Sequence, residues 1–147
     1  MTLLGDRYQL AEVIGTGGMS EVFAAEDTLL GRDVAVKRLR LELARDVNFR
    51  ERFRREAQNS GRLNHPTIVA VFDTGETTID GVTVPYIVME RVHGRTLRDI
   101  VREEGPLSPS RAAELLVPVA EALQASHDAG IIHRDVKPAN IMITNTG

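Results

Sequence analysis

The amino-acid sequence predicts an α+β fold, in which a β-rich first part that holds one helix precedes a mainly helical second part. Short valine-rich segments separated by glycine-containing turns dominate up to about residue 40, as is typical of β-strands. A helical spacing of apolar residues follows between residues 48 and 63. After Gly94 the helical pattern prevails, so we expect residues 1–93 and residues 94–147 to form two separate parts.

Turn residues bound the strands of the first part. Three strands are expected in the segments YQLAEVIG, SEVFAAED and RDVAVKRL, which cover residues 8–15, 20–27 and 32–39. Two more are expected after the helix, in IVAVFDTGE and VPYIVMERV, residues 68–76 and 84–92. The Asp80-Gly81 pair between them predicts a hairpin, because both residues tolerate the positive φ of a tight turn.

Two helices are predicted in the second part. RTLRDIVREEG, residues 95–105, reads as a short one. A longer helix should begin after Ser108 as N-cap, with Pro109 at its first position, and should end near Gly130. Its apolar stripe is expected to consist of Ala112, Leu115, Leu116, Val119, Ala122, Leu123 and Ser126.

The composition excludes several classes of protein. The net charge of -3 gives no reason to expect nucleic acid as a partner, and the absence of cysteine rules out disulfides and thiolate metal sites. No apolar run reaches the length of a membrane span, and the first residues lack the pattern of an export signal. We therefore expect a cytoplasmic segment without membrane contact, with an anchor, if there is one, in a later part of a longer protein.

The segment IGTGGMSEV, residues 14–22, is rich in glycine. Glycines let backbone N–H groups approach phosphate oxygens closely. The segment lacks the Gly-Lys-Ser/Thr ending of a P-loop and runs into a strand, whereas a Rossmann fingerprint runs into a helix. Two interpretations remain at this point, a flap over a phosphate group and a plain hairpin.

Lys37 and Glu56 are candidates for a charged pair that faces the interior. Strand alternation in DVAVK places Ala35 and Lys37 on one face, where a small side chain leaves room for a flat ring beside an ammonium group. In the helix, Phe49, Phe53 and Glu56 share one face, and a carboxylate turned toward a core needs a cation, for which Lys37 is the nearest candidate. The alternatives are a lysine facing water and a glutamate that bends out to solvent.

The segment HRDVKPAN places a carboxylate, an ammonium group and an amide within six residues, at Asp135, Lys137 and Asn140. Such groups can accept a hydroxyl proton, offset the charge of a phosphoryl group and ligate a hard cation. The order of these three groups indicates phosphoryl transfer.

Taken in order, the four patterns resemble those of the protein kinases. GTGGMSEV fits the Gly-rich loop, although Ser20 stands where a third glycine is usual; VAVK fits the strand lysine, RREAQ the helix glutamate and HRDVKPAN the catalytic loop. The segments DRYQLAEVIGTGGMSEVF and GIIHRDVKPANIMI are similar to actinobacterial receptor-type serine/threonine kinases of the PknB kind. The resemblance implies a protein-kinase-like fold, with a complete β-rich N-lobe and the beginning of the helical C-lobe.

The resemblance also implies ATP and magnesium as cofactors, with manganese as an alternative ion, and protein serine or threonine hydroxyls as acceptors. Asp135 would be the base, Lys137 would stabilise the γ-phosphoryl group and Asn140 would ligate magnesium. Lys37, positioned by Glu56, would hold the α- and β-phosphates. The other nucleotide-binding residues would be Ile14, Gly15, Thr16, Gly17, Gly18, Met19, Ser20, Val22, Ala35, Met89, Glu90 and Val92.

Two further expectations come from the resemblance. Arg7, Leu30 and Asp73 match positions through which similar kinases form N-lobe dimers, so a homodimer is expected there. The Asp-Phe-Gly segment and the activation loop are not in these residues, so the chain is expected to be inactive by itself. The alternative function is a non-catalytic nucleotide-binding or scaffold fragment with a kinase-like shape.

Overall fold

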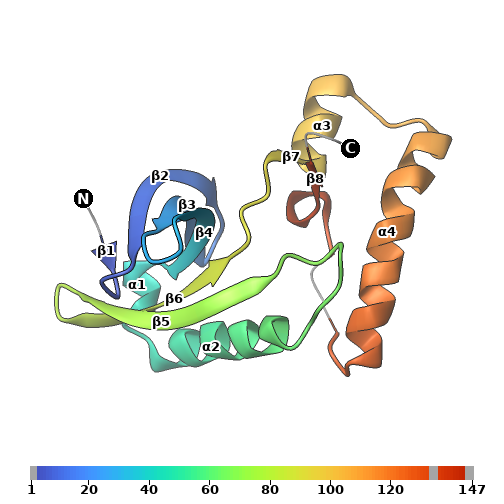
Figure 1. The fold of residues 1–147 in the computed structure, drawn as a ribbon. Helices are drawn as coiled ribbons and strands as arrows, with labels where there is room; N and C mark the ends of the chain where they lie inside the picture. The colour runs from blue at the N-terminus through green and yellow to red at the C-terminus, as the bar shows by residue number, and fades with distance from the viewer. Residues whose placement is uncertain (1–2, 133–135, 145–147) are drawn as a thin grey trace. The chain divides into compact units, whose positions relative to one another are not determined.

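A six-stranded antiparallel sheet dominates the first part of the chain (Figure 1). The structure is a computed structural model that describes residues 3–132 and 136–144. The strands are β1 (Leu3–Leu4), β2 (Tyr8–Thr16), β3 (Ser20–Asp27), β4 (Arg32–Leu39), β5 (Val71–Ile79) and β6 (Val82–Met89), in the spatial order β1-β2-β3-β4-β6-β5. The five strands expected from the sequence are confirmed, with shifted ends for β5 and β6, and β1 is additional.

The expected hairpin between β5 and β6 is present. Ile79 pairs with Val82, and the two turn residues, Asp80 and Gly81, have φ values of 50° and 77°. Positive φ at both central positions is the geometry that matches the twist of a two-residue hairpin. The Asp-Gly pair therefore fixes the register of the two strands.

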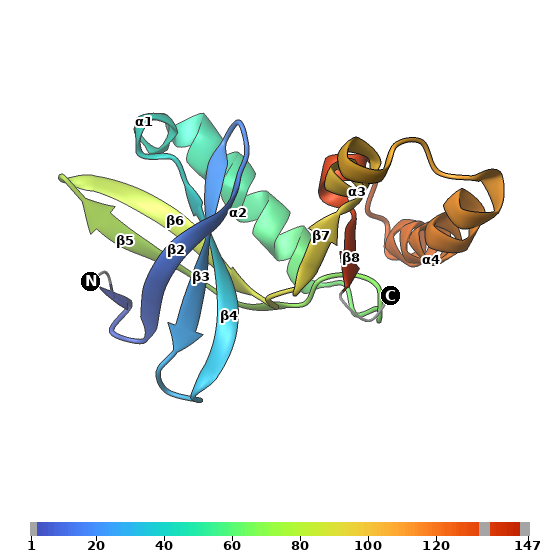
Figure 2. The same cartoon turned by 90° about the horizontal axis from the view of Figure 1, so that it is seen from above.

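One long helix lies along the sheet. It is α2 (Val47–Gly61), and Figures 1 and 2 both show it running beside β5 and β6. Asp46 caps its N-terminus by accepting a 2.9 Å hydrogen bond from the Asn48 N–H, as N-cap carboxylates do. A short helix, α1 (Leu41–Ala44), precedes it. The buried residues of α2 are Phe53 and Ala57.

The core of this unit occupies both faces of the sheet. On one face, Val34, Val36 and Val88 are fully buried in a cluster that also contains Tyr8 and Tyr86. On the other face, a second cluster joins the sheet to α1 and α2 and consists of Leu39, Ala44, Phe53, Ala57, Val84 and Ile87. The sheet is therefore held from both sides, as in a layered α+β unit.

Two compact units make up the chain: Met1–Arg62 with Ala70–Arg91, and Leu63–Val69 with Val92–Gly147. The second contains β7 (Gly94–Thr96), α3 (Leu97–Glu104), α4 (Pro109–Asp128), the 3-10 turn η1 (Pro138–Asn140) and β8 (Met142–Thr144). β7 and β8 form a small antiparallel sheet that the sequence did not predict. A Cβ at Gly94 would clash with the backbone of Ile143, so glycine is required for this close pairing.

The long helix of the second unit begins and ends as expected. The Ser108 hydroxyl accepts a 3.2 Å hydrogen bond from the Arg111 N–H, and Gly130 follows the last turn with φ of 78°. Ala122 and Ser126 of the expected stripe are buried, whereas Leu116 is 44% exposed. The buried face of this helix is therefore narrower than the apolar stripe predicted. Among the described residues, no helix combines the length and the apolar character that crossing a membrane would need.

Candidate functional site

The Gly-rich loop joins β2 and β3 as a tight turn. The Gly17 N–H donates a 2.9 Å hydrogen bond to the Ser20 carbonyl. Gly17 and Gly18 both have ordinary φ values, and a Cβ at Gly18 would meet none of the described atoms within 4 Å. A Cβ at Gly17 would approach only the Ser20 carbonyl, at 3.9 Å. The turn itself therefore does not require these two glycines, although each of them loses more conformational entropy on folding than alanine would.

The sheet brings several predicted nucleotide-site residues into register. Gly15 pairs with Val22, Val22 with Lys37, and Lys37 with Ile87 on β6. One alternation further along, Ala35 pairs with Met89. Cross-strand partners lie on the same face, so Val22, Ala35, Lys37 and Met89 share one face of the sheet. The expected alternation of β4 is thereby confirmed, with Val34 and Val36 buried on the opposite face.

The expected contact between Lys37 and Glu56 is not present in this structure. Glu56 is exposed, and its neighbour Ala57 takes the buried position next to Phe53. Lys37 is half-buried, and within residues 3–132 and 136–144 no ion pair joins it to a carboxylate. The expectation that Glu56 faces the core is wrong, because Phe53 and Ala57, four residues apart, already form the packed stripe and a carboxylate there would lose its hydration.

The side chains of the Gly-rich segment divide into two groups. Met19 packs against the core cluster under α2, and Ser20 is buried, so both side chains are part of the fold. Ile14 is 44% exposed and Thr16 is also exposed. Of the residues predicted to bind nucleotide, Met19 and Ser20 can therefore contribute backbone groups rather than side chains.

The segment after β6 is tied back to the chain before β5. The Glu90 N–H donates a 2.9 Å hydrogen bond to the Ala70 carbonyl, and the Glu90 carboxylate accepts a 3.2 Å bond from the Ala70 N–H. Because its N–H is already used, the Glu90 backbone can offer a ligand only its carbonyl oxygen. Val92, the other predicted backbone contact, begins the next stretch of the second unit.

Part of the predicted catalytic loop is described. Lys137 and Asn140 are exposed, and the Asn140 N–H donates a 2.9 Å hydrogen bond to the Lys137 carbonyl, which closes the turn η1. The Leu97 N–H donates a 2.8 Å bond to the Ile141 carbonyl, so the start of α3 holds this turn. Asp135, the predicted base, lies outside the described residues.

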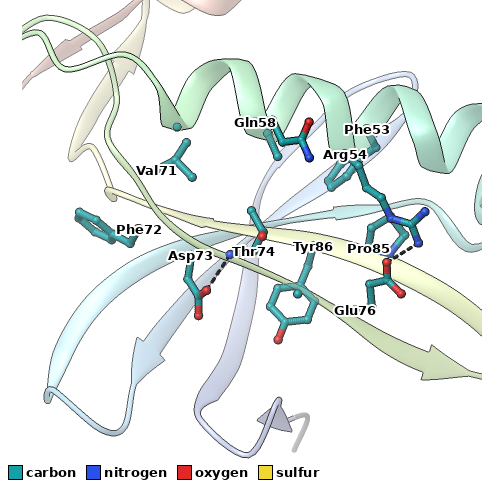
Figure 3. A pocket seen from close by; sticks show the side chains of 13 residues that line it. Phe53, Arg54, Gln58, Val71, Phe72, Asp73, Thr74, Glu76, Pro85 and Tyr86 are labelled. Atoms are coloured by element: carbon teal, nitrogen blue, oxygen red, sulfur yellow. Dashed lines mark hydrogen bonds and ion pairs between the residues drawn. The ribbon is translucent and has the colours of Figure 1, made fainter.

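A cavity of about 440 Å³ lies between α2 and β5, away from the predicted nucleotide residues. Figure 3 shows the rings of Phe53, Phe72 and Tyr86 around it and an ion pair between Arg54 and Glu76 at one end. None of the Gly-rich, lysine or hinge residues lines this cavity. It is therefore a feature separate from the predicted phosphate site.

The three residues expected at a dimer surface differ in what they contact. Arg7 donates two hydrogen bonds to the buried carboxylate of Asp27, whose pKa these bonds hold well below its usual range. Asp73 accepts a 2.7 Å bond from the Tyr8 hydroxyl, and burial, reinforced by that bond, raises the pKa of Tyr8. Leu30 is 60% exposed, so it alone of the three has a largely exposed side chain.

One contact of the Gly-rich loop was not expected from the sequence. The Arg40 guanidinium donates two hydrogen bonds to the Gly17 carbonyl, 3.1 Å from Nε and 2.9 Å from Nη2. Arginine at a strand end is usually a solvated residue, so the sequence carries no signal for this contact.

The chain is similar to known proteins of one family. The family described as "Protein kinase domain" matches residues 8–147. A probable serine/threonine-protein kinase of Corynebacterium efficiens is 74% identical over 145 residues, which are 99% of this chain and 22% of the relative. Serine/threonine-protein kinase PknB of Mycobacterium tuberculosis is 62% identical over 143 residues, 97% of this chain and 23% of the relative.

A solved kinase-domain structure has a fold similar to that of this chain. The crystal structure of the Mycobacterium tuberculosis PknI kinase domain matches with a TM-score of 0.81 and 33% identity, over 99% of this chain and 57% of that one. The chain thus spans less than a quarter of the length of these curated relatives and somewhat more than half of the solved domain.

Proposed function

Because this chain belongs to the protein kinase domain family, we propose that it forms the nucleotide-binding lobe and part of the catalytic loop of a serine/threonine kinase. The proposed reaction moves the γ-phosphoryl group of ATP to a serine or threonine hydroxyl of a protein. In this proposal residues 1–93 are the N-lobe and hinge, and residues 94–147 begin the C-lobe. We propose that this chain lies in the cytoplasm, where ATP is available.

The observation that carries the proposal is the pair of glycines, Gly17 and Gly18, that the turn itself does not need. A backbone without Cβ atoms admits phosphate oxygens close to its N–H groups, which gives these glycines a use that the fold does not supply. Lys37 supports the same reading, because it shares a sheet face with Val22 and Ala35 and is not held by an ion pair within the described residues.

Each proposed group has a role that suits its chemistry. Val22 and Met89, which are both half-buried, would supply apolar contacts for adenine beside the buried Ala35. The Glu90 carbonyl would accept a hydrogen bond from the amino group of adenine. Lys37 would offset phosphate charge, with Glu56 as its partner when nucleotide is bound. Magnesium neutralises phosphate charge when it is bound, and the amide oxygen of Asn140 is the type of donor that it prefers. Lys137 would stabilise the transferred group, and Asp135 would accept the hydroxyl proton.

The competing proposal is a non-catalytic module that binds nucleotide or serves as a scaffold. Incubating the full-length protein that carries this chain with γ-labelled ATP, magnesium and a generic protein substrate separates the two. Label on serine or threonine of the substrate supports the kinase. ATP binding without any transfer would favour the module, and no ATP binding at all would reject both nucleotide-dependent readings.

A homodimer through the surface around Leu30 is the proposed partner interaction. Leu30 is exposed at the turn between β3 and β4, and Asp27 fixes that turn by accepting hydrogen bonds from the Leu29 and Leu30 N–H groups. Arg7 and Asp73 would stabilise the folded chain beneath this surface, because Arg7 is hydrogen-bonded to Asp27 and Asp73 to Tyr8. Leu30 would then supply the apolar contact, with polar residues at the rim.

A further inference from the structure

Arg40 connects the Gly-rich loop to the body of the first unit. Its backbone N–H donates a 2.9 Å hydrogen bond to the Met19 carbonyl, and its guanidinium holds the Gly17 carbonyl through two bonds. Its own carbonyl accepts the N–H groups of Leu43 and Ala44, and Ala44 is fully buried in the core. One residue therefore links the loop tip to the first turn of α1 and to the core.

The geometry of the peptide bond gives this link a consequence. In a planar trans peptide the carbonyl of one residue and the N–H of the next point in opposite directions. With the Gly17 carbonyl directed to Arg40, the Gly18 N–H must be directed away from it. Among the described residues, this N–H has no acceptor, so it is available to an anion.

We propose that Arg40 is a positioning residue for phosphate binding, which acts by fixing the Gly17–Gly18 peptide plane so that the Gly18 N–H faces the nucleotide. The inference rests on the proposed function, since it assumes that ATP binds under this loop. Without the two guanidinium bonds, no described residue of the loop holds the Gly17 carbonyl, so this peptide can turn its carbonyl oxygen toward the phosphates, which would repel them. Arg40 itself does not contact the nucleotide in this account.

Two arginines near Arg40, Arg38 and Arg45, could serve as controls for the Arg40 variants. Arg38 stacks over the Phe23 ring at 4.7 Å, so its removal would disturb the sheet. Arg45 is exposed, and no contact of its side chain is found within the described part of the chain. Arg45→Ala removes the same charge and side chain as Arg40→Ala and is therefore the matched control.

The test measures ATP and adenosine binding to the full-length protein by calorimetry. Arg40→Ala should weaken ATP binding about tenfold, which corresponds to the loss of charge-assisted hydrogen bonds. Adenosine binding should stay unchanged. Arg40→Lys should lose nearly as much, because a lysine cannot reproduce the two-pronged contact. Arg45→Ala should bind both ligands normally. Full ATP affinity in Arg40→Lys would overturn the proposal, since charge alone would then suffice. Equal losses for ATP and adenosine in Arg40→Ala would also overturn it, because the effect would then not be specific to phosphate.

Amide hydrogen exchange tests the same link without nucleotide. In Arg40→Ala, exchange of the Gly17 amide, which is hydrogen-bonded to the Ser20 carbonyl, should accelerate, whereas the β3–β4 pairing should keep its protection. Unchanged exchange in this loop would contradict the positioning role. If the wild-type protein does not bind ATP but its loop still loosens in Arg40→Ala, the proposed function fails while the structural link holds. The two failures are thus distinguishable.

Discussion

Arg7 and Asp27 are joined by two hydrogen bonds, 2.9 Å from Nε to Oδ1 and 2.8 Å from Nη2 to Oδ2. The Asp27 carboxylate is fully buried, and it also accepts bonds from the N–H groups of Leu29 and Leu30. The pair therefore fastens the start of β2 to the turn between β3 and β4. A buried carboxylate needs such partners, because its hydration is lost.

Acidification should destabilise the first unit through Asp27. Its pKa in the folded state is lowered, chiefly by the Arg7 hydrogen bonds, so the folded state favours the ionised form. The stabilisation is present above about pH 4, the ordinary pKa range of aspartate, and is lost as the pH falls through the lowered folded-state value. Thermal unfolding measured from about pH 7 to about pH 3 should show a falling midpoint.

Asp27→Asn tests that assignment. The variant should unfold at a lower temperature at neutral pH, and its midpoint should depend less on acid than that of the wild type. Asp33→Asn is the matched control, because Asp33 is exposed and lies on the neighbouring strand. An acid response that is the same in Asp27→Asn and the wild type would assign the effect to other carboxylates.

Gly18→Ala should separate folding from nucleotide binding. Because Gly18 has an ordinary φ and free space around its Cα, alanine should leave stability unchanged or raise it by about 0.5 kcal/mol. ATP binding should weaken, because the methyl group occupies the approach to the backbone. Gly81→Ala is the contrast: its φ of 77° predicts a destabilised lobe. Equal ATP affinity in Gly18→Ala and the wild type would argue against phosphate binding at this turn.

Lys37 and Glu56 should be uncoupled in the absence of nucleotide. Glu56 is exposed and not paired with Lys37, so a double-mutant cycle of Lys37→Met and Glu56→Gln should give a coupling in stability within about 0.5 kcal/mol of zero. If the proposed pair forms with ATP bound, the same cycle measured on kcat/KM should show coupling. Strong coupling in stability without ATP would mean that the pair exists in the free protein.

Leu30→Asp should weaken self-association if the proposed dimer forms. A charged residue at an apolar contact is unfavourable, and Leu30 is exposed, so the change should not disturb the fold. Sedimentation of the full-length protein at several concentrations measures this. Val47→Asp is the control, because Val47 is also an exposed apolar residue of the first unit but begins α2. Equal sedimentation of Leu30→Asp and the wild type would exclude this surface.

Local signals predicted most of the first unit. Alternating valines define β4, and the Asp80-Gly81 turn fixes the β5–β6 register, because each depends only on neighbouring residues. The pairing of β7 with β8 could not be predicted, since three-residue strands more than forty residues apart carry no periodic signal. Sequence spacing thus predicted strands of the six-stranded sheet but not the separate two-stranded sheet of the second unit.

In the candidate site, too, local spacing predicted some features and long-range packing decided the others. The shared face of Ala35 and Lys37 follows from strand alternation, and the structure has it. Helical spacing from Phe53 fits both Glu56 and Ala57, three and four residues on, and only packing against the sheet selects Ala57. The Arg40 contact joins a side chain to a backbone carbonyl twenty-three residues earlier, and no residue pattern predicts such a bond.

Phosphoryl transfer by Asp135→Asn tests the central claim most directly. Full-length protein and this variant are compared for ATP affinity and for transfer of labelled phosphate to a protein substrate. Because the proposed base acts on the hydroxyl and not on the nucleotide, ATP affinity should be nearly unchanged while transfer falls by at least about a hundredfold. Transfer at the wild-type rate by Asp135→Asn would contradict the assignment of this chain to the catalytic machinery of a kinase.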